Sequence, residues 1–158
     1  MLLPLLLSVF LTTPAGTIEG KIVPPEKVTI TKPVQVVVFS GSYVNFYLAE
    51  VQKRLDNYWE EYKSAFIQDK EAYILFRERA QRQAMEVAIN RMQFDDPRNI
   101  ANFVHTSKDM KFQFRSVPQG ECKVVALITI GNQEFVWSQT VILMDETPVS
   151  ITLQPTTP

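Results

Sequence analysis

The feature that most constrains the fold is a run of 45 residues without glycine or proline, residues 49–93, between two segments of strand-like composition. This run holds 16 of the 33 charged residues in the chain, eight of each sign. Glycine and proline are the residues that most often interrupt helices. The sequence therefore predicts a charged helical insertion, at about residues 45–93, inside a β domain.

Apolar residues recur in this insertion at steps of three and four, which is the spacing of one helix face. The first stripe consists of Leu48, Val51, Leu55, Tyr58, Tyr62 and Phe66, and the second of Tyr73, Phe76, Ala80, Ala84, Val87 and Ala88. Between the stripes, the position that should continue the pattern is Asp69. The pattern therefore allows a break near residues 68–70.

Chain length favours two helices over one. A single helix over residues 49–93 would be about 65 Å long at about 1.5 Å per residue. The return segment 94–110 reaches at most about 60 Å when fully extended. We therefore expect an antiparallel helical hairpin. The alternative is one long helix that lies across the β domain or pairs with another subunit.

The flanking segments contain short runs of β-type residues bounded by turn residues. The predicted strands are Thr17–Val23, Val34–Phe39, Lys111–Arg115, Cys122–Ile130, Glu134–Thr140 and Val149–Leu153. The strand Val34–Phe39 can extend toward Tyr43–Phe46. Two of the predicted strands, Val34–Phe39 and Cys122–Ile130, are apolar at nearly every position, as in strands covered on both faces. This pattern predicts a mainly β fold, a seven-strand-type antiparallel β-sandwich interrupted by the helical insertion.

The N-terminus has the features of a signal peptide. Residues 2–11 are apolar except for Ser8, a length that suits the apolar region of a signal peptide but falls short of the ~20 residues that span a bilayer. Thr13 and Ala15 are small residues at the positions that precede a cut after Ala15. We expect residues 1–15 to be removed, a single domain at 16–158, and an exported protein: periplasmic, secreted or at the cell surface.

Composition limits the chemistry available to the chain. The net charge of −1 gives no global attraction to nucleic acid or to anionic membranes. One cysteine excludes an internal disulfide, and one histidine excludes most zinc chemistry. We therefore expect no nucleic-acid partner, no cofactor and no metal site.

His105 is the single candidate for metal or acid–base chemistry. Asp95, Asp96 and Asp109 are near it in sequence, but nothing in their spacing fixes a ligand set. We expect a solvated loop here, with Asp95 and Asp96 followed by a proline that stops the helix. An enzymatic hypothesis would depend on His105 alone.

The remaining candidates for chemistry have structural interpretations. Cys122 begins an apolar strand and is expected to be a small buried hydrophobe. The segment 40–42 is not a nucleophile elbow and is expected to be a turn. Glu60 and Glu61 are successive helix positions whose side chains diverge, so they are expected on a solvated face. We therefore expect no enzymatic activity.

Aromatic residues are concentrated in the middle of the insertion. They are Tyr58, Trp59, Tyr62, Phe66, Tyr73 and Phe76. At helical spacing such residues usually form a core, but an exposed set would provide a partner-binding surface. These six residues are the candidate partner-binding site.

Residues 107–126 carry a Phe-x-Phe pair, then Val-Pro-x-Gly and a strand rich in valine and alanine. The motif residues are Phe112, Phe114, Val117, Pro118 and Gly120. This pattern resembles the core of carboxypeptidase regulatory-like domains, in the transthyretin-like and carbohydrate-binding-like group of β-sandwiches. Thr17–Val23 and Val149–Leu153 resemble the opening and closing strands of that family, whereas Cys122 stands where tyrosine is usual.

The resemblance implies a non-catalytic accessory module. Our first hypothesis is that the protein associates with a protein of the cell envelope or surface through its helical insertion, which could also pair two copies of the chain. The alternative is a carbohydrate-binding module, since some related sandwiches bind carbohydrate. Trp137 and Tyr43 are the candidate sugar-contacting aromatics for this alternative.

Overall fold

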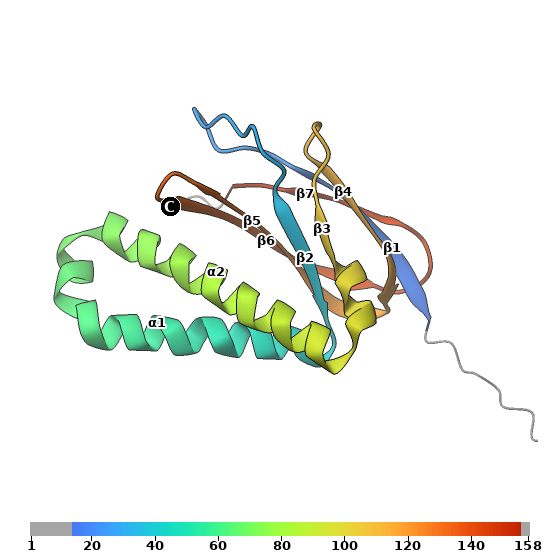
Figure 1. Cartoon of the computed structure of the whole chain (residues 1–158), viewed down its shortest axis with the longest axis horizontal. Helices are drawn as coiled ribbons and strands as arrows, with labels where there is room; N and C mark the ends of the chain where they lie inside the picture. Colours follow the sequence, from blue (N-terminus) through green and yellow to red (C-terminus); the bar gives the residue numbers. More distant parts are fainter. Residues whose placement is uncertain (1–13, 156–158) are drawn as a thin grey trace, which may run out of the picture.

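The chain forms seven strands in two sheets and a helical hairpin, described here for residues 14–155 of a computed structural model (Figure 1). The predicted signal peptide lies outside these residues except for its last two. One sheet has the order β4-β1-β7 and the other the order β3-β2-β5-β6. The strands are β1 Ala15–Ile22, β2 Gln35–Ser40, β3 Phe103–His105, β4 Lys111–Pro118, β5 Gly120–Ile130, β6 Gln133–Leu143 and β7 Val149–Leu153.

The two sheets enclose a common apolar core in a sandwich-like arrangement. Buried residues from six strands contribute to it, among them Ile18 of β1, Phe114 of β4 and Trp137 of β6. The first and last thirds of the chain therefore share one core, as the sequence predicts.

The prediction of an entirely antiparallel sandwich is wrong for one strand pair. β1 pairs antiparallel with β4 but parallel with β7, with Ile18 opposite Val149 and Ile22 opposite Leu153. β7 reaches this sheet from β6 of the other sheet through the short link 144–148. Its direction is therefore set by the crossing between sheets and not by a hairpin turn.

The helical insertion is a hairpin, as the chain-length argument predicts. It consists of α1 Ser42–Gln68 and α2 Lys70–Asp95, and a short 3₁₀-helix, η1 Pro97–Asn102, follows. Asp69 alone separates the two helices, and its side chain accepts hydrogen bonds from the backbone N–H groups of Glu71 and Ala72. A side-chain cap of this kind stabilises the start of a helix, so the break falls at the one polar position in the apolar stripe.

The hairpin is longer than predicted. The sequence allows the strand Val34–Phe39 to extend toward Tyr43–Phe46, but these residues belong to the first turn of α1. With 27 and 26 residues in the two helices, the chain is a mixed α and β protein and not a mainly β one. Packing outweighs the β propensity of these residues. In the helix, Val44 and Tyr47 lie on one face and are both buried against the sheet.

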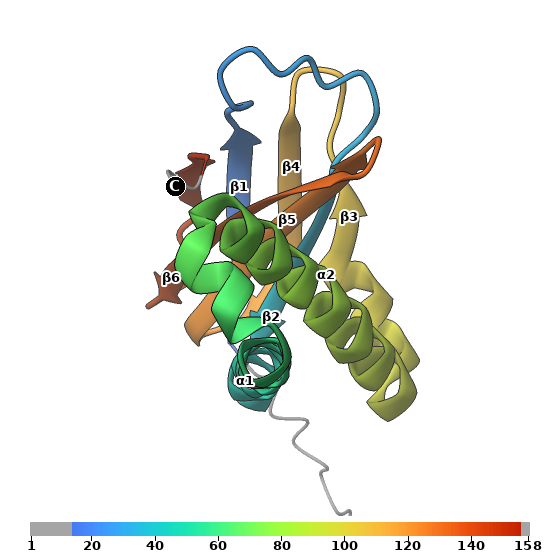
Figure 2. The ribbon, with the colours of Figure 1, turned by 90° about the vertical axis from the view of Figure 1, so that its left-hand side faces the viewer.

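The hairpin covers the outer face of the four-stranded sheet and makes a third layer (Figure 2). In β2, Val36 and Val38 face the core between the sheets, whereas Val37 and Phe39 face the hairpin. The prediction that β2 and β5 are covered on both faces is therefore confirmed. No helix among residues 14–155 is long and apolar enough to cross a membrane.

The motif that carries the family resemblance lies in the core of the three-stranded sheet. Phe112, Phe114 and Val117 are buried, whereas Pro118 is exposed at the end of β4. Gly120 adopts a φ of +116°, a backbone conformation that favours glycine. Gly20 lies opposite Phe112, and a Cβ atom at Gly20 would lie 2.0 Å from the Phe112 ring, so the ring occupies the space that the glycine leaves.

Candidate functional site: a cleft between the hairpin and strand β6

A cleft lies between the N-terminal half of α2 and β6, the edge strand of its sheet. We call it the hairpin cleft, and its volume is about 700 Å³. The cleft is lined from α2 by Ala72, Ile74 and Leu75, and from β6 by Gln133, Phe135, Val136 and Trp137, with Pro25 and Pro155 at its far side. Its walls are therefore mainly apolar.

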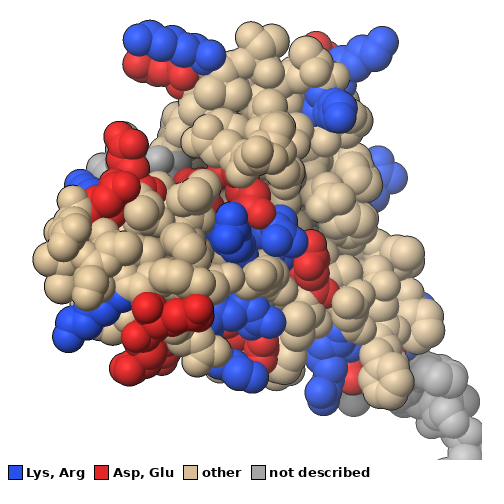
Figure 3. Space-filling model, turned by 60° about the vertical axis from the view of Figure 1, so that its left-hand side comes forward, with Lys and Arg blue, Asp and Glu red and all other residues tan. Residues whose placement is uncertain are grey.

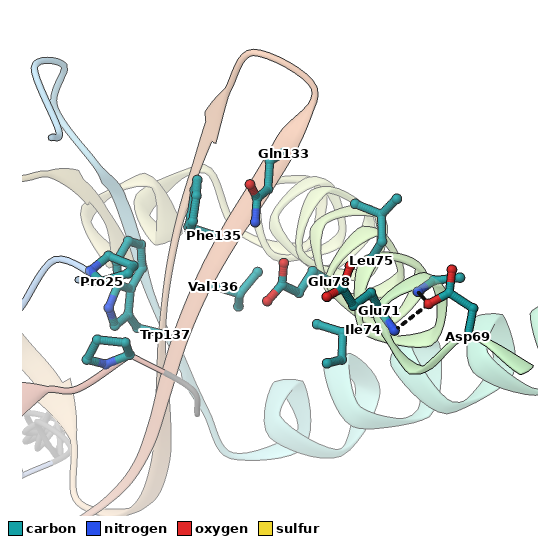
Figure 4. A pocket seen from close by; sticks show the side chains of 12 residues that line it. Pro25, Asp69, Glu71, Ile74, Leu75, Glu78, Gln133, Phe135, Val136 and Trp137 are labelled. Atoms are coloured by element: carbon teal, nitrogen blue, oxygen red, sulfur yellow. Dashed lines mark hydrogen bonds between the residues drawn. The ribbon is translucent and has the colours of Figure 1, made fainter. Parts of the chain in front are cut away.

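Three carboxylates also line the hairpin cleft: Asp69, Glu71 and Glu78. Glu71 and Glu78 are seven residues apart, so they share one helix face with Ile74 and Leu75 between them. Figure 4 shows the side chains of Glu71 and Glu78 on the side of α2 that faces β6, and Asp69 at the start of the helix. The hairpin cleft is thus an apolar site with acidic groups on a single wall.

Glu78 is half-buried, and its carboxyl pKa is raised. The main cause is burial, which disfavours the charged form; the Arg77 charge lowers the pKa and the Glu134 charge raises it. Glu78 forms no ion pair with any of residues 14–155. Its negative charge is therefore poorly compensated within the chain.

An ion pair holds α2 against β6 beside the hairpin cleft. Arg82 donates through Nε to the buried carboxylate of Glu134 and through Nη1 to Glu86, at 2.8 Å. These hydrogen bonds raise the pKa of Arg82. Arg82, which lies one helical turn after Glu78, is therefore paired with Glu134 and Glu86.

The structure brings together all six candidate partner-binding aromatics at the far end of the hairpin. Ring contacts link α1 to α2, as between Tyr58 and Phe76, whose centroids are 4.9 Å apart, and between Phe66 and Tyr73. Phe66 is buried, whereas Trp59 and Tyr62 are 40% and 37% exposed. The cluster therefore holds the two helices together and leaves two rings partly open to solvent.

The two candidate sugar-contacting aromatics are not brought together. Trp137 is 1% exposed, and its indole Nε1 donates to the carbonyl of Val23 at 3.0 Å. Tyr43 is half-buried at the start of α1, where its hydroxyl donates to Asp95 at 2.9 Å. Trp137 therefore does not offer the open face on which a sugar would stack.

His105 and its neighbouring carboxylates do not converge on a site. His105 is exposed at the end of β3, a strand that the sequence interpretation had placed in a loop. Asp96 caps η1 and accepts hydrogen bonds from Arg98, which lower its carboxyl pKa. Within residues 14–155, no group of three or more histidine, cysteine, aspartate or glutamate side chains is placed to hold a metal ion.

Cys122 is fully buried, as predicted, and its Sγ lies 3.3 Å from the carbonyl oxygen of Val141. Burial, with a smaller contribution from Glu121, raises the thiol pKa to about 11 from its ordinary 9.0. The neutral thiol is therefore favoured in the fold. Its contribution to stability is fully present below pH 9 and is lost as the pH rises toward 11.

We predict that Cys122 in the folded chain resists iodoacetamide at pH 8 and is alkylated rapidly in 6 M guanidinium chloride, as measured by mass spectrometry. Because only the native chain loses the thiol contribution, its free energy of unfolding should fall more steeply between pH 9 and 11 than that of Cys122→Ala. Equal pH dependence of the two chains would contradict the burial of the thiol.

Comparisons with known proteins assign no family to this arrangement. No protein-family model and no curated protein matches the chain. Among solved structures, the crystal structure of a candidate carbohydrate binding protein from Pseudomonas aeruginosa, at 2.61 Å resolution, matches with a TM-score of 0.40 and 14% identity over 90% of each chain. Membership of the carboxypeptidase regulatory-like family stays a prediction.

Proposed function

We propose that the chain is an exported, non-enzymatic binding module that holds a protein partner of the cell envelope or surface against its helical hairpin. The observation that carries this proposal is the hairpin cleft. Its volume of about 700 Å³ lies within the range of about 300–1,000 Å³ typical of small-molecule sites, which is also enough space for side chains that a partner protein inserts. Its mainly apolar walls with a few polar groups are also typical of such sites.

The positions of the reactive side chains support a non-enzymatic role. The Cys122 thiol is buried with a raised pKa, so it is a poor nucleophile. His105 is exposed on β3 and is not among the residues that line the hairpin cleft. Export is supported by the apolar segment 2–11 and the small residues before Gly16, and fractionation of cells that express the tagged chain would test it.

Site-specific photo-crosslinking tests the binding surface. A p-benzoylphenylalanine would replace Leu75 in the hairpin cleft, Trp59 in the aromatic cluster, or the exposed Ala49 of α1 as a control. We expect a protein adduct from position 75, identified by mass spectrometry. Ala72→Trp, which fills the hairpin cleft, should abolish this adduct, whereas Ala49→Trp should not.

Other crosslinking outcomes would contradict the proposal in distinct ways. An adduct from position 59 alone would move the interface to the aromatic cluster. An adduct of twice the mass of the mature chain would indicate pairing of two copies. Equal yield from positions 75 and 49, or no effect of Ala72→Trp, would exclude the hairpin cleft as the binding surface.

A carbohydrate ligand is the second candidate, because Glu71, Glu78 and Gln133 bring hydrogen-bonding groups into the same cleft. Carboxylates and amides accept hydrogen bonds from hydroxyl groups. The buried position of Trp137 favours the protein partner over this candidate. A glycan array, read with and without Ca²⁺, would decide between them, and a glycan hit abolished by Ala72→Trp would favour carbohydrate.

A further inference from the structure

The charge of the hairpin cleft is one-sided. Three of its lining residues are carboxylates, and none is a lysine, arginine or histidine. This contrasts with the surface around it, where Figure 3 shows side chains of both signs interspersed over the face that the hairpin presents. A one-signed, partly enclosed site favours ligands of the opposite charge.

The positive charges near the hairpin cleft do not neutralise these carboxylates. Arg82 is held by Glu134 and Glu86, so its guanidinium is committed beside the cleft. Arg77 lowers the pKa of Glu78, but burial outweighs this effect. Glu71 and Glu78 therefore lack an ion-pair partner among residues 14–155.

Apart from Gln133, the residues with which β6 lines the hairpin cleft are apolar. Leu75 and Ile74 lie between the two glutamates on α2, and Val136 of β6 points toward them, whereas Phe135 lies on the other face of β6. Lysine and arginine side chains carry an apolar stem and a cationic end, and they commonly bury the stem along apolar surface. The hairpin cleft offers contacts for both parts of such a side chain.

We propose that the hairpin cleft binds a lysine or arginine side chain of the partner protein, flanked by apolar residues. The cationic end lies between Glu71 and Glu78, and the stem packs on Leu75 and Val136. This inference rests on the proposed function, since it names the chemistry of the partner that the hairpin cleft would hold. Charge complementarity and the apolar wall select this occupant over an anionic or uncharged one.

Matched peptide probes test the proposal by NMR titration of the ¹⁵N-labelled chain. The probes are acetyl-Leu-Lys-Leu-amide and its variants with norleucine or glutamate at the centre, read at the backbone amides of Ala72, Leu75 and Phe135. We expect the lysine peptide to bind at least about tenfold more tightly than the norleucine peptide, because charge-assisted hydrogen bonds are stronger than neutral ones. The glutamate peptide should not bind.

Variants that remove carboxylate charges test whether Glu71 and Glu78 bind the lysine side chain of the peptide. The double variant Glu71→Gln/Glu78→Gln should weaken the lysine peptide about tenfold and leave the norleucine peptide unchanged. Glu60→Gln/Glu61→Gln, which removes two exposed charges from α1, is the matched control and should change neither affinity. Because burial raises the pKa of Glu78, its replacement by glutamine should not destabilise the fold at pH 7, and thermal unfolding checks this.

The outcomes separate this inference from the proposed function. Equal affinity for the lysine and norleucine peptides would overturn the cation site while leaving the hairpin cleft as a binding surface. The absence of shifts with the lysine peptide at millimolar concentration would also overturn it, whatever the crosslinking experiment returns. Loss of the crosslink on Ala72→Trp with no effect of the double glutamine variant would support the proposed function alone.

Discussion

Replacement of Trp137 by alanine is expected to lower the free energy of unfolding by about 3–5 kcal/mol, the usual cost of removing a large buried aromatic side chain. Trp137 is 1% exposed and belongs to the core between the two sheets. Its indole also holds the segment after β1 through the carbonyl of Val23. The substitution therefore leaves a cavity and an unpaired carbonyl at one place.

Urea unfolding followed by circular dichroism would measure this loss, and the other tryptophan provides a control. Trp59 is 40% exposed at the far end of the hairpin, so Trp59→Ala should cost about 1 kcal/mol or less. Equal losses for the two variants would contradict the placement of Trp137 in the core that joins the sheets.

The layers of the fold could be predicted because apolar patterns report burial directly. Val34–Phe39 is apolar on both sides of the strand, which requires cover on both faces. The insertion is the only segment long enough to supply the second cover. Asp69 likewise marks the helix break, since a polar residue in an apolar stripe is both a poor core residue and a good helix cap.

The pairing of strands could not be predicted, because it depends on contacts between residues distant in sequence. The parallel pairing of β1 with β7 follows from where the chain crosses between the sheets, and nothing in the residues of β7 encodes its direction. β3 is three residues long, and its pairing with Val36 and Val37 of β2 defines it more than its own composition does.

The hairpin cleft also could not be predicted from the sequence, although the spacing of two glutamates on α2 was a signal for it. From the sequence alone, Glu71 and Glu78 belong to the general charge of the insertion. Their spacing places them on one helix face with Ile74 and Leu75, an arrangement of acid, apolar pair and acid. This pattern becomes a candidate site only when β6 lies opposite, and the position of β6 depends on the tertiary fold.

The second large effect is expected at the outer face of the four-stranded sheet, where the hairpin docks. Phe39 is fully buried between β2 and α1, and its ring stacks on that of Tyr47 with centroids 4.8 Å apart. Phe39→Ala should cost about 3–5 kcal/mol, because it removes a large side chain from a closely packed cluster. The substitution weakens the packing between the hairpin and the sheet, because Phe39 faces away from the core between the sheets.

Hydrogen exchange distinguishes this effect from the loss at Trp137. In Phe39→Ala, amides of α1 near Val44 and Tyr47 should lose protection first, because their packing partner is removed while the inter-sheet core is intact. The matched substitution on the other face of the same strand, Val38→Ala, should instead weaken protection in β1 and β4. Identical exchange patterns for the two variants would mean that the hairpin and the two sheets form one cooperative unit. The hairpin cleft, which forms only when α2 packs beside β6, would then open only when the whole domain unfolds.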